Sequence, residues 1–170
     1  EMMYLMDDEI LPRITKRFKL PFIVHKTILT ANIGESFLAK EIEEIEDNLP
    51  THIKLAYLPK LGQVRLRLSA KGHNEAELNK EVENYAGQNI SKVNKFVVTD
   101  EDIPMEKAIL DLMKSKGVTL STAESCTGGY IAHLITQHPG SSSVYWGGAV
   151  AYAYELKESI LGVKESTLNN

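Results

Sequence analysis

TAESCTGG, at residues 122–129, joins two segments whose side-chain patterns differ. Residues 118–122 have the composition of a strand, and residues 128–138 carry apolar side chains at the spacing of a helix face. Turns of this kind lie at the carboxyl ends of strands, where α/β sheets bind their ligands. We therefore expect the stretch to form a ligand-binding turn between a strand and a helix.

The alternation of helices and strands continues on both sides of this turn. Helix-like residues 105–116 end before Gly117, a residue type typical of a C-cap, and precede the turn. Strand-like residues 149–152 and helix-like residues 155–161 follow it. This order predicts a parallel sheet with covering helices, an α/β domain over residues 101–170.

An α+β pattern comes before this domain. We expect a strand at 22–29, an amphipathic helix at 35–47, strands at 53–58 and 64–68, and a helix from an Asn74 cap to about residue 90. These elements make a self-contained unit over residues 20–100. In its last strand apolar residues alternate with Arg65 and Arg67, which we expect to be solvated.

The first residues have a different character. Residues 2–18 show a roughly helical spacing of apolar side chains, with acids early and bases late, as the helix dipole favours. The chain begins at Glu1 and stops soon after a helix-like pattern. We expect a piece of a longer protein, with residues 1–19 as the last helix of a preceding domain.

Composition excludes several classes of protein. The 170 residues are 43% hydrophobic and 25% charged, which is ordinary for a globular protein, and no apolar run reaches the roughly 20 residues of a membrane span. A single cysteine, Cys126, and the lack of a signal peptide predict a cytoplasmic protein. The net charge of −4 does not favour a polyanionic partner.

Ser125 lies where a nucleophile would be placed, since it is in the turn between the predicted strand and the predicted helix. A serine needs a base. Tyr152 ends the next predicted strand, and Lys157 lies in the first turn of the predicted helix that follows. If those strands are neighbours, the three side chains converge at one edge of the sheet. Small residues let a substrate approach the backbone there, and helix N–H groups can bind an anion; these residues are Thr127, Gly128 and Gly129. The loop at residues 140–143 could bring a further hydroxyl to the same edge.

Each of these residues also has a simpler interpretation. The Ser/Thr/Gly cluster can be a plain helix cap, Lys157 a surface lysine and Tyr152 a core aromatic. Cys126 is a rival nucleophile near a helix N-terminus, but its base is missing because His133 and His138 lie beyond reach. No zinc-ligand spacing occurs, so we expect a site without metal.

RNA binding is a further alternative, because residues 20–100 are similar in pattern to small RNA-binding α+β domains. Such domains contact the RNA backbone through a glycine-rich loop, whereas here one glycine, Gly34, is followed by Glu35. A modest basic patch lies beside acidic helices and comprises Lys60, Arg65, Arg67 and Lys71. We do not expect a nucleic-acid partner.

Four features together resemble the start of the C-terminal domain of CinA, the competence/damage-inducible protein family of bacteria. They are TAESCTGG, the downstream Gly140-Ser141-Ser142, the spacing from Tyr152 to Lys157, and Leu161-Gly162-Val163. The resemblance implies a KH-like α+β connecting domain at 20–100 and the first half of a three-layer α/β amidohydrolase domain at 101–170. Residues 1–19 would end a molybdopterin-binding-like domain linked to ADP-ribose pyrophosphatase activity.

The resemblance also implies an activity, because the family's C-terminal domain is similar to nicotinamide mononucleotide deamidase. That enzyme hydrolyses its substrate to nicotinate mononucleotide and ammonia. Ser125 would be the nucleophile, Lys157 the general base, Tyr152 the hydroxyl that positions or relays the proton, and Ser142 part of the substrate pocket. Further site residues of the family would come from beyond Asn170, so this chain alone would be inactive.

The resemblance implies no cofactor for the deamidase and a divalent metal only for the missing N-terminal domain. The implied partners are the nucleotide substrate and a second copy of the chain in a dimer, without a membrane. Ala153-Tyr154 departs from the Ser-Asn that relatives often carry, which would alter the helix cap or pocket wall. The alternative function is a non-catalytic nucleotide-binding or interaction module, which would keep ligand affinity without Ser125 and Lys157.

Overall fold

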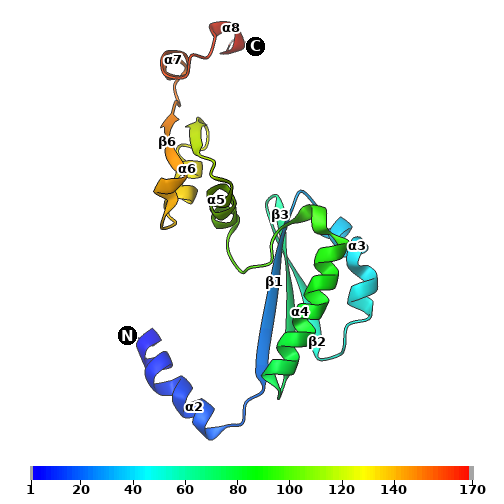
Figure 1. Ribbon diagram of the computed structural model, residues 1–170. Coiled ribbons are helices and arrows are strands. Elements are labelled where there is room, and N and C mark those ends of the chain that lie inside the picture. Colours follow the sequence, from blue (N-terminus) through cyan, green and yellow to red (C-terminus); the bar gives the residue numbers. More distant parts are fainter. Residues whose placement is uncertain (1, 169–170) are drawn as a thin grey trace. The chain divides into compact units, whose positions relative to one another are not determined.

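The computed structural model describes residues 2–168 and divides into two compact units, Glu1–Asp102 and Ile103–Asn170 (Figure 1). Both units combine helices with strands, so the predicted mixed α/β class is confirmed. Among the described residues, no helix combines the length and the apolar character needed to cross a membrane.

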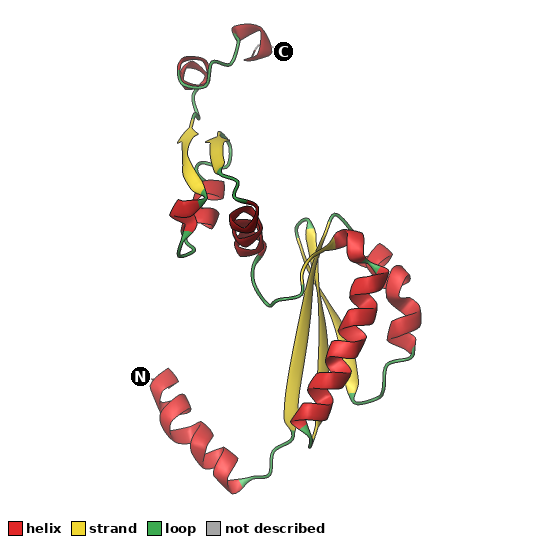
Figure 2. Cartoon of the chain, viewed as in Figure 1, coloured by secondary structure: helices red, strands yellow, loops and turns green. Residues whose placement is uncertain are grey.

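The first unit is built around a four-stranded antiparallel sheet. Its strands are ordered β2-β3-β1-β4, with bounds β1 Phe22–Ala31, β2 Ile53–Lys60, β3 Gln63–Gly72 and β4 Val97–Thr99. Figure 2 shows two long helices beside this sheet, α3 (Glu35–Asp47) and α4 (Glu75–Lys92). Short helical segments complete the unit: α1 Met2–Tyr4, the π-helix η1 Leu5–Ile10, α2 Leu11–Arg17 and the 3₁₀ turn η2 Asn94–Phe96.

The core of the first unit follows from the alternation in β3 and the apolar face of α3. Leu66 and Leu68 from the strand pack with Leu38 and Ile42 from the helix, and all four are fully buried. Burial of each such side chain stabilises the fold by about 1.5–3 kcal/mol. The side chain of Asn74 accepts a hydrogen bond from the Glu77 N–H at 3.4 Å, as the capping pattern predicts.

The acidic residues that follow β4 contradict the prediction that Arg65 is solvated. Arg65 is not solvated: its guanidinium donates to the Asp102 carboxylate, and its side chain is only 20% exposed. Lys26 Nζ lies 2.9 Å from the Asp100 carboxylate and 3.2 Å from that of Glu83, and the hydrogen bond to Asp100 is the main cause that raises the pKa of Lys26. Because β4 pairs with β1, Asp100 and Asp102 come within reach of these cations of the sheet, although both carboxylates stay more than half exposed.

The second unit contains two parallel strands, β5 (Leu120–Glu124) and β6 (Tyr145–Val150), as predicted for an α/β domain. Around them are α5 Met105–Lys116, α6 Tyr130–Thr136, the 3₁₀ turn η3 Ser141–Ser143, α7 Tyr154–Ser159 and α8 Glu165–Leu168. Gly117 ends α5 with φ 63°, the left-handed conformation of a C-cap. Leu110, Ile135 and Val144 form the buried cluster of this unit.

The second strand of this pair differs from its predicted bounds of 149–152. It begins at Tyr145 and ends at Val150, so Tyr152 lies beyond the strand and does not end it. The difference arises because Gly147 and Gly148, which have low strand propensity, pair with Ser121 and Thr122 of β5. A glycine at this point permits the close approach of the two strands.

Candidate active site

The TAESCTGG stretch forms the end of β5 and a compact turn before α6. The Gly128 N–H donates to the Ser125 carbonyl at 3.0 Å, and the Tyr130 N–H donates to the Thr127 carbonyl at 2.9 Å. Gly128 and Gly129 have φ values of 60° and 91°, which disfavour residues with side chains. The two glycines are therefore required by the backbone path of the turn itself.

The exits of β5 and β6 lie side by side, which is the condition under which the predicted site residues could converge. Glu124 pairs with Val150 at the ends of the strands, and the Ala151 N–H donates to the Glu124 carbonyl at 2.8 Å. Ser125 is the next residue of one chain segment, and Tyr152 follows Ala151 in the other. The structure thus places the turn at residues 125–129, called the Ser125 turn below, beside the residues that follow β6 and include Tyr152.

The three predicted catalytic residues differ in their exposure and do not contact one another through hydrogen bonds in the described part of the chain. Ser125 and Lys157 are half-buried, whereas Tyr152 is 71% exposed. Lys157 Nζ lies 4.8 Å from the centroid of the Tyr154 ring. Among residues 2–168, no hydrogen bond joins the side chains of Ser125, Tyr152 and Lys157, so the hydrogen-bonded arrangement of a nucleophile with its base is not formed.

The remaining predicted site residues are Ser142 and the residues of the turn after Ser125. Thr127 and Cys126 are both exposed, and the thiol of Cys126 is free. Ser142 lies in η3, before β6 begins, and so belongs to the amino end of that strand. Because Ser125 follows the carboxyl end of the parallel strand β5, the structure does not bring Ser142 to the edge where Ser125 lies.

Glu124 has a part in this site that was not among the sequence-based predictions. Its side chain is 3% exposed, and its carboxylate accepts hydrogen bonds from the N–H groups of Ile131 at 3.0 Å and Ala132 at 2.8 Å. Burial alone would raise the pKa of the Glu124 carboxyl, but these two N–H groups and the hydroxyls of Thr127 and Thr122 outweigh it, and the pKa is lowered. An acid at the end of a strand, six residues before a helix, is the signal that could have identified it.

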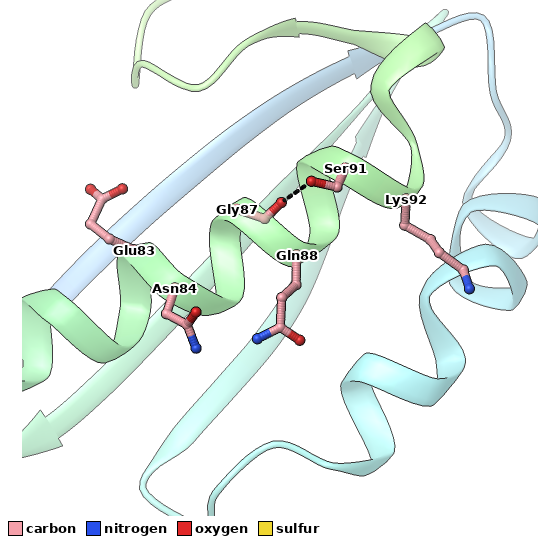
Figure 3. A pocket seen from close by; sticks show the side chains of 6 residues that line it. All are labelled: Glu83, Asn84, Gly87, Gln88, Ser91 and Lys92. Atoms are coloured by element: carbon pink, nitrogen blue, oxygen red, sulfur yellow. Dashed lines mark hydrogen bonds between the residues drawn. The ribbon is translucent and has the colours of Figure 1, made fainter.

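No metal site accompanies these residues within the described part of the chain, where no group of three or more His, Cys, Asp or Glu side chains could hold an ion. A shallow depression lies elsewhere, along one face of α4 (Figure 3). All of its lining residues come from that helix: Glu83, Asn84, Gly87, Gln88, Ser91 and Lys92. It includes none of the predicted site residues, and the Gly87 carbonyl within it accepts a hydrogen bond from the Ser91 hydroxyl at 2.9 Å.

Replacement of Gly87 by alanine is expected to stabilise the first unit by about 0.5–1 kcal/mol. Gly87 lies inside α4 without a positive φ, and a Cβ added there would meet no atom within 4 Å. The urea midpoint of the first unit should rise with an unchanged denaturant slope. A lower midpoint would contradict this and would show that the depression needs to stay open for the fold.

Comparisons with known proteins agree with this arrangement of two units. The family model described as "Damage-inducible protein CinA KH domain" matches residues 25–97, and the one described as "CinA C-terminal domain" matches residues 102–170. A CinA-like protein of Flavobacterium psychrophilum is 46% identical over 170 residues, which are 99% of this chain and 41% of that protein. A CinA-like protein of Cytophaga hutchinsonii is 37% identical over 169 residues, 99% of this chain and 40% of that protein.

Among solved structures, the competence/damage inducible protein CihA from Agrobacterium tumefaciens is 42% identical, with a TM-score of 0.37, over 38% of this chain and 39% of that one. The chain spans about two fifths of the length of the curated relatives it matches. The two family models lie in succession and together take in most of the chain. The chain therefore belongs to the CinA family of competence/damage-inducible proteins.

Proposed function

We propose that the protein containing this chain is an amidohydrolase that converts nicotinamide mononucleotide and water to nicotinate mononucleotide and ammonia. The observation that carries the proposal is the junction of the two strand exits, where the Ala151 N–H donates to the Glu124 carbonyl. At this junction Ser125 lies in a turn with several backbone N–H groups. The residues that follow β6, among them Tyr152 and Lys157, begin next to it. Membership of the CinA family supports a hydrolase, and the resemblance described above supports this substrate.

The proposed chemistry is acyl transfer through a serine ester. The Lys157 amine takes the proton of the Ser125 hydroxyl, directly or through Tyr152, and Ser125 Oγ attacks the carboxamide carbon. The tetrahedral intermediate collapses, the C–N bond breaks, and the proton returns to the departing nitrogen, so that ammonia leaves. Water then attacks the ester carbon, with Lys157 as base, and releases nicotinate mononucleotide and the free serine.

The turn offers donors for the oxyanion formed in each step. Within the described residues, the N–H groups of Cys126 and Thr127 donate to no acceptor, whereas those of Ile131 and Ala132 are bound to Glu124. Free N–H groups next to a nucleophile stabilise developing negative charge at low reorganisation cost. We assign the oxyanion to the N–H groups at residues 126–127.

Assembly of the site requires the Lys157 amine to leave the Tyr154 ring and approach Ser125. A cation–π contact at an exposed tyrosine contributes only about 0.5–1 kcal/mol, so substrate binding can offset its loss.

The proposal also covers the rest of the protein. Residues 20–100 are the KH-like connecting domain, and residues 1–19 are the last helix of an ADP-ribose pyrophosphatase domain. The deamidase needs no cofactor, and the whole protein acts as a cytoplasmic dimer.

Ammonia release by the full-length protein tests the function. With nicotinamide mononucleotide as substrate, we expect ammonia and nicotinate mononucleotide in equal amounts, at a rate that excess EDTA does not lower. Folded protein that binds the nucleotide without releasing ammonia would overturn the proposal and favour the non-catalytic binding module.

A further inference from the structure

Glu124 is the residue through which three elements of the second unit meet. Its backbone ends β5, and its carbonyl accepts from the Ala151 N–H just beyond β6. Its carboxylate accepts from the Ile131 and Ala132 N–H groups in the first turn of α6. One residue thus ties the ends of both strands to the beginning of the helix.

The Ser125 turn depends on this anchor because it has few other attachments. Cys126, Thr127 and Gly128 are exposed, and the backbone hydrogen bonds of the turn join its own residues to one another and to α6. Gly129 lies close to β6, since a Cβ added there would be 3.3 Å from Val150 Cγ2. The position of Ser125 relative to the neighbouring strand is therefore set at Glu124 on one side and at Gly129 on the other.

The buried carboxylate is chemically suited to this anchoring. Each of its two oxygens accepts one N–H of α6, and the hydroxyls of Thr127 and Thr122 also stabilise its negative charge. It also withdraws the Ile131 and Ala132 N–H groups from any incoming anion. An oxyanion can consequently use only the donors of the turn itself, next to Ser125.

We propose that Glu124 is a positioning residue that holds the Ser125 turn in its reactive geometry by binding the start of α6. The proposal rests on the proposed role of Ser125 as a nucleophile. Glutamine has the same size as glutamate, but its NH₂ group would face an N–H donor and one of the two hydrogen bonds would be lost. Aspartate keeps both acceptor oxygens and the charge but is shorter by one methylene group.

The test uses the full-length protein with Glu124→Gln and Glu124→Asp, and Glu165→Gln as the matched control at an exposed glutamate of the same unit. We expect Glu124→Gln to lower kcat for nicotinamide mononucleotide about 100-fold with KM nearly unchanged, because a displaced nucleophile affects the chemical step. Glu124→Asp should recover part of this loss, and Glu165→Gln should match the parent. Equal kcat in Glu124→Gln and the parent would overturn the proposal, as would a change confined to KM.

A second readout separates this proposal from the choice of substrate. The rate at which a fluorophosphonate labels Ser125 needs no nucleotide, and we expect Glu124→Gln to lower it about 100-fold while Glu165→Gln leaves it unchanged. If the parent is labelled but releases no ammonia, the substrate assignment fails and the labelling rates still decide the role of Glu124. If Glu124→Gln does not fold, Glu124→Asp takes its place in the test. A kcat and a labelling rate of Glu124→Asp that both equal those of the parent would overturn the proposal.

Discussion

Replacement of Ser125 by alanine in the full-length protein is expected to lower ammonia release from nicotinamide mononucleotide by about 10⁴-fold or more. In the proposed steps the Ser125 hydroxyl oxygen is the atom that bonds to the substrate carbon, so its removal abolishes the acyl transfer. Ser125 is half-buried next to the exit of β6, so the substitution removes one oxygen without opening a cavity in the core. Binding of the nucleotide and the unfolding midpoint should remain close to those of the parent.

Two further variants assign the partners of Ser125. Lys157→Arg keeps a cation over the Tyr154 ring, but an arginine cannot serve as a base, so we expect a loss comparable to that of Ser125→Ala. Cys126→Ala should retain parental activity, because the exposed thiol has no role in the proposed steps. Activity retained by Ser125→Ala and lost by Cys126→Ala would contradict the assignment and identify a thiol hydrolase.

The parts of the fold that were predicted from sequence are those with a strong periodic pattern. The helix expected at 35–47 has these bounds in the structure because Leu38 and Ile42 recur on one face and enter the core. The strand β4 was missed: it has three residues and pairs with β1 only at Leu29 and Thr30, too short a segment for any alternation. Its presence explains why the acids that follow it bind Lys26 and Arg65.

The site could be predicted only to the level of topology. Parallel neighbouring strands were enough to expect Ser125 near the segment of Tyr152, and the structure has this arrangement. An acid at the end of a strand and six residues before a helix points to Glu124, but the N–H groups that its carboxylate binds leave no periodic trace in the sequence. Ser142 lies in η3 before β6, at the amino end of that strand, and its part in the substrate pocket stays a prediction.

The strand pairing that supports the site leaves no room for a side chain at Gly148. An added Cβ would lie 2.2 Å from Thr122 Oγ1, 2.5 Å from the Tyr145 hydroxyl and 2.9 Å from the Thr122 carbonyl oxygen. Those two hydroxyls are themselves hydrogen-bonded at 2.7 Å across the strands. The side chains can rotate away, but the carbonyl belongs to the paired backbone of β5, where Thr122 faces Gly148.

Gly148→Ala is therefore expected to destabilise the second unit by about 3 kcal/mol, the upper part of the usual range for overpacking. Separation of β6 from β5 would also move the Ser125 turn away from Tyr152, so activity should fall together with the urea midpoint of this unit. Adding Thr122→Ala removes the nearest oxygen, and the double variant should regain part of the stability even though Thr122→Ala alone breaks the bond to Tyr145. Additive losses in this double-mutant cycle would contradict a direct clash, whereas partial recovery of both stability and ammonia release would show that the site depends on close pairing at Gly148.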